Sequence, residues 1–263
     1  MSAANPETVL ITGASSGIGL ELAKCFAADC CKLVLVARNI AALEKIAEEL
    51  RRKNKIEAIV LPADLSLPET PKRIFRELSA QKISVDVLVN NAGFGLHDAF
   101  VKLPLQRQLE IIQVNVTALT ELTGLFLPEM IQRKNGGILN VASVAGFLPG
   151  PNMAVYYASK AFVLSFSEAL AEELGGTGVT VSAFCPGATE SNFSQIARGE
   201  KSRKSKTTKM SAEQAARYGH RAFRNEQVVA IPGLQNHFLV FLTRILPRQT
   251  VRKAVHSFNK LDE

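Results

Sequence analysis

The sequence has no tryptophan, three tyrosines and only four cysteines among 263 residues. The cysteines are Cys25, Cys30, Cys31 and Cys185, and they lack the paired spacing of a zinc site. We interpret Cys30 and Cys31 as the end of a helix and the start of a strand rather than a redox pair. Few cysteines without a framework pattern indicate reduced thiols, and we therefore expect a cytoplasmic protein.

The sequence also lacks the patterns of targeting and membrane-spanning segments. The N-terminus has no charged lead followed by an apolar stretch, so we expect no secretory signal. No run of roughly 18 apolar residues occurs, which argues against a spanning helix. The length fits one α/β domain with a large core, and no internal repeat or interdomain linker interrupts it.

Acidic residues are scarce only in the last quarter of the chain. Residues 1–197 hold 17 Lys/Arg against 19 Asp/Glu, a net charge of −2, whereas residues 198–263 hold 14 against 5, a net charge of +9. The overall +7 therefore belongs to the C-terminal region.

Short apolar runs alternate with amphipathic stretches along the chain. The runs expected to be strands are Val9–Ile11, Leu33–Ala37, Ala58–Leu61, Val85–Val89, Gly137–Ala142, Val179–Phe184 and Val228–Ile231. Fully apolar strands separated by helices predict a parallel sheet with helices on both faces, in one domain over 1–263. Ligands of such a sheet bind beyond the carboxyl ends of its strands.

A glycine-rich turn follows the first of these runs. TGASSGIG covers Thr12–Gly19, and helical spacing begins after it. Glycines at a strand-to-helix turn let a pyrophosphate approach the backbone N–H groups at the helix N-terminus. The alternative is a glycine-rich turn without a ligand.

A phenol and an ammonium group stand four residues apart in YYASK, at Tyr156 and Lys160. This spacing places both on one face of a helix, and a nearby cation is expected to lower the pKa of the phenol. Such a phenol can donate a proton to an alkoxide or accept one in the reverse direction. Tyr157 is the rival at i+3, and we interpret it as a packing residue.

TGASSGIG, NNAG at Asn90–Gly93, Ser143 and YYASK occur in an order and spacing that resemble the classical subgroup of the short-chain dehydrogenase/reductase family. The resemblance covers most of the chain. It implies a Rossmann-type, doubly wound, seven-stranded sheet in the order 3-2-1-4-5-6-7. It also selects Tyr156 over Tyr157, because the family pattern is YxxxK.

The resemblance assigns catalytic roles to four residues. Ser143 would hydrogen-bond the substrate carbonyl, Tyr156 would transfer the proton, and Lys160 would hold the nicotinamide ribose. Asn115 would position a water next to the lysine, although a helix-interior amide bonded to backbone is the alternative reading. The cofactor-binding residues we predict are Gly13, Ser15, Ser16, Gly17, Ile18, Gly19, Arg38, Asn39, Asp64, Leu65, Asn90, Ala92, Gly93, Tyr156, Lys160, Pro186, Gly187, Thr189 and Ser191.

The end of the second strand predicts which dinucleotide binds. An acidic residue there would hold the ribose diol of NAD, but the chain has Ala37 followed by Arg38. A guanidinium can grip a 2′-phosphate with two hydrogen bonds, so we predict NADP(H), with a solvent-facing Arg38 as the alternative. Whether Thr189 or Ser191 bonds the carboxamide is left open, although spacing favours Ser191.

Two C-terminal segments have separate predictions. Residues 190–212 are expected to form a mobile substrate loop, followed by a helix capped by Ser211. Residues 234–263 form an apolar and basic extension of the same domain, in which Phe238–Leu246 is interpreted as a buried helix or a subunit contact. Peripheral contact with an anionic membrane is the alternative. Nucleic acid is not expected as a partner, since no recognition motif is present.

The sequence therefore predicts an NADP(H)-dependent oxidoreductase that acts on a small-molecule carbonyl or secondary alcohol. The expected pocket residues are mostly apolar, which favours a hydrophobic substrate; they are Phe94, Gly95, Leu96, Val144, Ala145, Phe147, Pro149, Met153 and Phe193. An NADP(H)-binding regulator without turnover is the first alternative, and a nucleotide-sugar epimerase or dehydratase is the second. The family suggests a homodimer or homotetramer.

Overall fold

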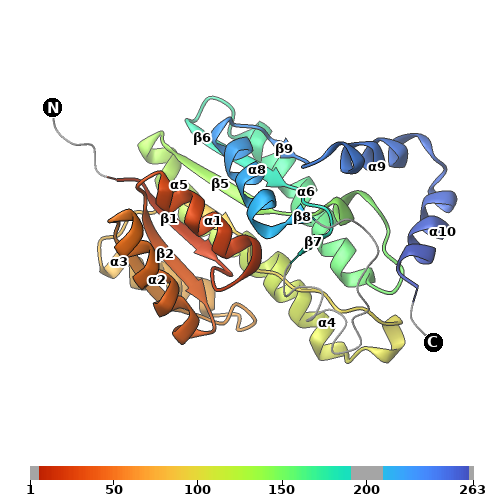
Figure 1. Cartoon of the computed structure of the whole chain (residues 1–263), viewed down its shortest axis with the longest axis horizontal. Coiled ribbons are helices and arrows are strands. Elements are labelled where there is room, and N and C mark those ends of the chain that lie inside the picture. The colour runs from red at the N-terminus through yellow and green to blue at the C-terminus, as the bar shows by residue number, and fades with distance from the viewer. Residues whose placement is uncertain (1–5, 191–209, 261–263) are drawn as a thin grey trace.

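The computed structural model describes residues 6–190 and 210–260 (Figure 1). Its main feature is a seven-stranded parallel sheet in the order β3-β2-β1-β4-β5-β6-β9. The strands are β1 (Thr8–Thr12), β2 (Lys32–Ala37), β3 (Ala58–Pro62), β4 (Val87–Asn90), β5 (Gly136–Val141), β6 (Val179–Phe184) and β9 (Val229–Ala230). The predicted fold class and strand order are confirmed, with β9 as the seventh strand.

Helices cover both faces of the sheet because its strands are apolar on both sides. Val9 and Ile11 of β1 pack in one core cluster with α1 (Gly17–Ala28), α2 (Ile40–Asn54) and α8 (Ala212–Arg224). Leu10, which points the other way, packs with α3 (Thr70–Ala80) and α5 (Ala118–Arg133). The remaining helices are α4 (Leu105–Ile112), α6 (Ala154–Glu173), α9 (Leu234–Ile245) and α10 (Arg248–Phe258), with short turns at η1 (Phe100–Lys102), η2 (Gln113–Thr117) and η3 (Val144–Phe147).

A continuous helical stretch runs through α4, η2 and α5. By length and composition alone, Leu105–Arg133 could cross a membrane. Leu122, Phe126 and Met130 lie in the core cluster beneath the sheet, so we interpret this stretch as a core helix.

The segment 190–212 differs from its prediction at both ends. Thr189–Glu190 (β7) and Met210–Ser211 (β8) pair as a separate two-stranded parallel sheet. Ser211 then begins α8 with the predicted cap, as part of a capping box with Gln214. A single loop over the whole of 190–212 is therefore wrong at its ends, and Ser191 and Phe193 lie outside the described residues.

For the C-terminal apolar segment, the prediction of a buried helix is wrong, and the alternative of a subunit contact stays a prediction. Of the residues in α9, only Val240 is buried. The helix projects at the end of the molecule remote from α2 and α3 (Figure 1), and apart from Val240 its apolar side chains are not buried by the described residues.

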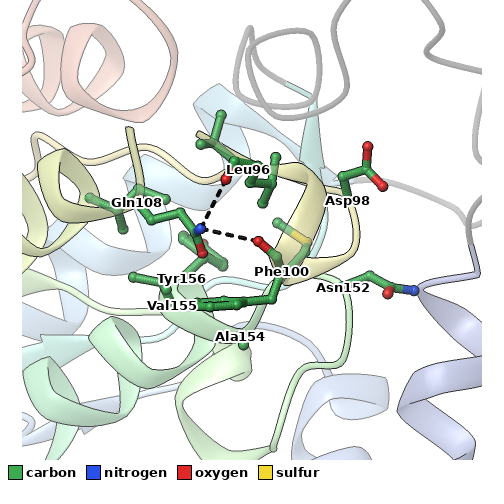
Figure 2. Close-up of a pocket in the computed structure, with 11 residues that line it drawn as sticks. Leu96, Asp98, Phe100, Gln108, Asn152, Ala154, Val155 and Tyr156 are labelled. Carbon is green, nitrogen blue, oxygen red and sulfur yellow. Dashed lines mark hydrogen bonds between the residues drawn. The ribbon is translucent and has the colours of Figure 1, made fainter. Parts of the chain in front are cut away.

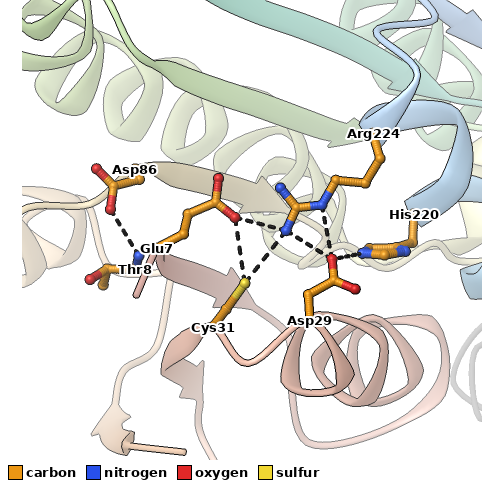
Figure 3. Close-up of polar contacts among 7 residues, drawn as sticks. All are labelled: Glu7, Thr8, Asp29, Cys31, Asp86, His220 and Arg224. Atoms are coloured by element: carbon orange, nitrogen blue, oxygen red, sulfur yellow. Dashed lines mark hydrogen bonds and ion pairs between the residues drawn. The ribbon is translucent and has the colours of Figure 1, made fainter. Parts of the chain in front are cut away.

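An ionic cluster joins α8 to the first βαβ unit (Figure 3). The Arg224 guanidinium contacts Glu7 at 2.7 Å, Asp29 at 3.0 Å and the Cys31 sulfur at 3.4 Å. His220 also reaches Asp29 at 2.9 Å. One cation therefore ties together the start of β1, the end of α1 and the start of β2.

We expect Arg224→Leu to lower the free energy of unfolding by about 2 kcal/mol, because it leaves two carboxylates without their shared cation. Chemical denaturation monitored by circular dichroism would measure this. Arg217→Leu is the matched control, since its pair with Glu213 is an exposed contact within one helix, and it should cost less than about 0.5 kcal/mol. Equal losses in the two variants would contradict the prediction.

Candidate active site

The turns after β1 and β4 are held against each other. The Thr12 hydroxyl accepts hydrogen bonds from the backbone N–H groups of Asn91 and Ala92, both at 3.0 Å. The Asn91 side chain donates back to the Thr12 carbonyl at 2.8 Å. A Cβ at Gly19 would collide with Gly13 and with the Asn91 amide, so only glycine permits this close approach. Thr12 and Asn91 thus fix the shape of the glycine turn.

The start of α1 leaves backbone donors for a ligand. Gly17 has a positive φ of 56°, and α1 begins there, at the carboxyl end of β1. Ser16 is its N-cap and makes no side-chain capping hydrogen bond to any described residue. The first N–H groups of the helix, including that of Ile18, are therefore suited to an anion. With Ser15 half-buried in the same turn, these residues fit a dinucleotide pyrophosphate.

The ends of β2 and β3 bring a cation near a carboxylate. Arg38 is exposed directly after β2. Burial opposes ionisation of Asp64, but hydrogen bonds from Ser66 and the nearby guanidinium groups of Arg38 and Arg107 hold the pKa of Asp64 below its usual range. Asn39 accepts a hydrogen bond from the Ala42 N–H as the cap of α2, so its oxygen already has a local role.

Two other predicted binding residues, Asn90 and Leu65, have buried side chains. Asn90 is buried and donates to Asn140 at 2.9 Å and Thr123 at 3.1 Å, so its side chain braces β4 against β5 and α5. Leu65 is buried in the core beside Asp64. The side-chain amide of Asn90 therefore has a structural role, and its predicted cofactor contact stays a prediction.

Ser143, Tyr156 and Lys160 come together where β5 and β6 end. Ser143 lies two residues beyond β5, and its hydroxyl hydrogen-bonds Tyr156 and also approaches the Pro186 carbonyl at 3.3 Å. Lys160 is buried in α6, with Nζ donating to the Val141 carbonyl at 2.7 Å and lying 5.9 Å from the centroid of the Tyr156 ring. The i and i+4 spacing therefore places both side chains in one site.

The predicted lowering of the tyrosine pKa is wrong. The phenol end of Tyr156 is enclosed, and burial raises the pKa of this group, while the hydrogen bond from Ser143 opposes the rise. Burial also lowers the pKa of Lys160 to about 8. Hence Tyr156 is a protonated, neutral donor near neutral pH, and Lys160 is a cation only below about pH 8.

Asn115 lies in the π-helical turn η2, where its side chain is buried. Its oxygen accepts from the Phe94 N–H at 3.1 Å, and its amide donates to the Phe94 carbonyl and to Ser159, both at 3.0 Å. A Cβ at Gly93 would lie 3.1 Å from the Asn115 oxygen and 3.4 Å from Lys160 Nζ. Asn115 thus holds the NNAG turn beside the lysine, and its water-positioning role remains a prediction.

The turn after β6 closes the other side of the site. Pro186 is buried, and a Cβ at Gly187 would meet the Asn236 side chain at 2.6 Å. The Thr189 hydroxyl donates to the Gly187 carbonyl at 3.1 Å. Since Ser191 is outside the described residues, the choice between the two hydroxyls is not tested.

A pocket opens next to Tyr156 (Figure 2). Gln108 is buried at its wall and donates to the carbonyls of Phe100 and Leu103 at 3.2 and 3.3 Å. The lining residues are Leu96, Asp98, Phe100, Leu103, Gln108, Ile111, Asn152, Met153, Ala154, Val155 and Tyr156. Leu96 and Met153 were predicted from the sequence, whereas Val144 and Phe147 instead pack against a core cluster.

Comparisons with known proteins agree with the fold. The family model for short chain dehydrogenase matches residues 7–202. A short chain dehydrogenase of Pseudocercospora fijiensis is 37% identical over 189 residues, which cover 71% of this chain and 61% of that protein. The chain thus spans less than two thirds of that relative's length.

Two solved structures cover nearly the whole chain. A short-chain dehydrogenase from Sphingobium yanoikuyae in complex with NADPH has a TM-score of 0.80 at 32% identity, covering 92% of this chain and 97% of that one. The bulky-bulky ketone specific alcohol dehydrogenase from Comamonas testosteroni has a TM-score of 0.77 at 32% identity, covering 93% and 96%.

Proposed function

The chain belongs to the short-chain dehydrogenase family. From this premise we propose that it is an oxidoreductase that reduces a carbonyl or oxidises a secondary alcohol with NADP(H). The observation that carries the proposal is the meeting of Ser143, Tyr156 and Lys160 beside the NNAG turn. NADP(H) would supply the hydride when bound. The fit of the glycine turn and the α1 N-terminus to a pyrophosphate supports its binding.

The residues of this chain would bind the substrate oxygen, transfer the proton and position the cofactor. Ser143 would donate a hydrogen bond to the substrate oxygen and stabilise the charge that develops there. The Tyr156 hydroxyl would pass its proton to the same oxygen, and Lys160 would hold the ribose hydroxyls and stabilise negative charge on the phenol. Asn115 would keep Phe94 and the NNAG turn in place beside them.

The lining of the pocket supports a hydrophobic substrate. Leu96, Phe100, Leu103 and Ile111 supply apolar surface, and Asp98 and Asn152 are polar groups at the same pocket. The Comamonas enzyme, whose name specifies bulky ketones, is consistent with such a substrate. We therefore propose a ketone or aldehyde with apolar substituents.

A homo-oligomer is also part of the proposal. Leu105, Leu109 and Ile112 are exposed at i, i+4 and i+7 along α4, which is the spacing of one apolar helix face. Arg107 and Glu110 of the same helix supply charges of both signs. The apolar face suits a second copy of the chain, and the two charges lie on the other side of the helix.

An NADPH-oxidation assay with a panel of aldehydes and ketones of increasing size tests the function. We expect turnover that rises with apolar substituents and exceeds the rate without carbonyl compound by at least about 10²-fold. NADPH affinity would be measured in parallel by fluorescence. Tight NADPH binding without turnover on any member, in either direction, would instead support the regulatory alternative.

A further inference from the structure

The outer face of α9 carries an apolar stripe that no other described element covers. Leu234, Phe238, Phe241 and Ile245 follow the spacing i, i+4, i+7 and i+11, so they share one face of the helix. Their exposed fractions are 88%, 63%, 56% and 60%. Large apolar side chains gathered on a surface in this way mark an interaction site.

Among the described residues after Glu226, the charged side chains are all cations. Residues 227–261 contain no Asp or Glu. Arg244 lies within α9, and α10 carries Arg248, Arg252 and Lys253, all of them exposed. In contrast to the mixed charges of α4, the described residues from 227 to 260 have charge of one sign only.

The same two helices reach the candidate active site. Val251 and Val255 of α10 are buried in a cluster against which Met153 and Tyr156 pack. Asn259, at the end of α10, donates to the Tyr157 hydroxyl at 3.2 Å and accepts from Asn152 at 2.9 Å. Asn152 and Met153 line the pocket, so α10 and the residue after it contact part of the pocket wall.

We propose that α9 and α10 form a docking surface for an anionic membrane, with the apolar stripe inserted at the headgroup level and the cations contacting acidic lipids. Phe and Leu on one helix face with Arg and Lys beside them is the composition of an interfacial helix. The charge pattern selects this occupant. The described residues of α9 and α10 carry cations and no carboxylates, which complements acidic lipids, whereas a second copy would bring the same cations together. Docking would place the pocket near the lipid, where apolar substrates concentrate.

Vesicle sedimentation of the full chain tests the proposal. We expect it to sediment with vesicles of phosphatidylcholine and phosphatidylglycerol, to bind phosphatidylcholine alone at least tenfold more weakly, and to dissociate as NaCl rises from about 0.05 to about 0.5 M. Phe238→Ser/Phe241→Ser should weaken binding by about tenfold or more through lost insertion. Arg248→Gln/Arg252→Gln/Lys253→Gln should weaken it roughly 100-fold, since each cation near an anionic surface contributes about a factor of five.

The controls separate lipid from other occupants. Leu67→Ser removes an exposed apolar side chain outside the C-terminal helices and should leave vesicle binding unchanged. Sedimentation velocity without lipid should give the same mass for the wild type and for Phe238→Ser/Phe241→Ser. The proposal is overturned if the wild type does not bind the anionic vesicles, if both multiple variants bind like the wild type, or if the phenylalanine variant dissociates an oligomer without any loss of vesicle binding.

Discussion

Tyr156→Phe is expected to lower kcat by about 10³-fold while the chain folds normally and binds NADPH with unchanged affinity. The substitution removes only the hydroxyl that hydrogen-bonds Ser143, and the ring still packs against the cluster that contains Val251 and Val255. Without that hydroxyl, the oxygen of a reduced substrate loses the group that we propose as its proton donor. Steady-state kinetics on the best substrate of the panel, with NADPH affinity measured separately, would check this.

The raised pKa of Tyr156 is compatible with proton donation. An alkoxide formed by hydride addition is far more basic than a phenolate, so even a weakly acidic phenol can transfer its proton to it. Because burial raises its pKa, the phenol still carries its proton at neutral pH. Ser143 and a cationic Lys160 would then stabilise the phenolate that remains.

Tyr157→Phe is the matched control for this experiment. It removes a hydroxyl from the neighbouring residue, which accepts a hydrogen bond from Asn259 and lies in the interior. We expect it to lower stability by about 1 kcal/mol and to leave kcat within a few-fold of the wild type. If Tyr156→Phe retained most of its turnover, or if Tyr157→Phe lost it, the proton-donor assignment would be wrong.

Local patterns predicted the parts of the site that depend on neighbouring residues in the sequence. Tyr156 and Lys160 share a helix face because they are i and i+4, and the glycines lie at a strand-to-helix turn because apolar and helical spacing flank them. The strand order came from the family resemblance and is confirmed. These predictions required no knowledge of which distant segments touch.

Contacts between distant segments could not be predicted in this way. Thr12 and Asn91 are 79 residues apart, and Tyr157 and Asn259 are 102 apart. Gln108 resembles any polar residue of an amphipathic helix until the carbonyls of η1 and the residue after it are placed beside it. The prediction of a lowered pKa for Tyr156 failed for the same reason. The proximity of a lysine is visible in the sequence, whereas the burial that raises the pKa is not.

The cofactor preference leads to the second large effect: Arg38→Asp is expected to lower the NADPH-over-NADH ratio of kcat/KM by about 100-fold. The guanidinium lies at the end of β2, close enough to Asp64 to lower the pKa of that carboxyl, and its exposed position lets it pair with a 2′-phosphate. An aspartate would repel that phosphate and could accept hydrogen bonds from the ribose diol of NADH instead. Kinetics with both cofactors at one ionic strength would give the ratio.

Arg52→Asp makes the same change of net charge on the exposed side of α2 and serves as the control. If long-range attraction alone favoured NADPH, both variants would shift the ratio similarly, and added salt would remove the difference from the wild type. A contact at Arg38 predicts a shift in Arg38→Asp alone. An unchanged ratio in that variant would exclude Arg38 from the phosphate site and leave the turn after β1 to hold the 2′-phosphate, although Ser15 and Ser16 there have hydroxyls but no cation.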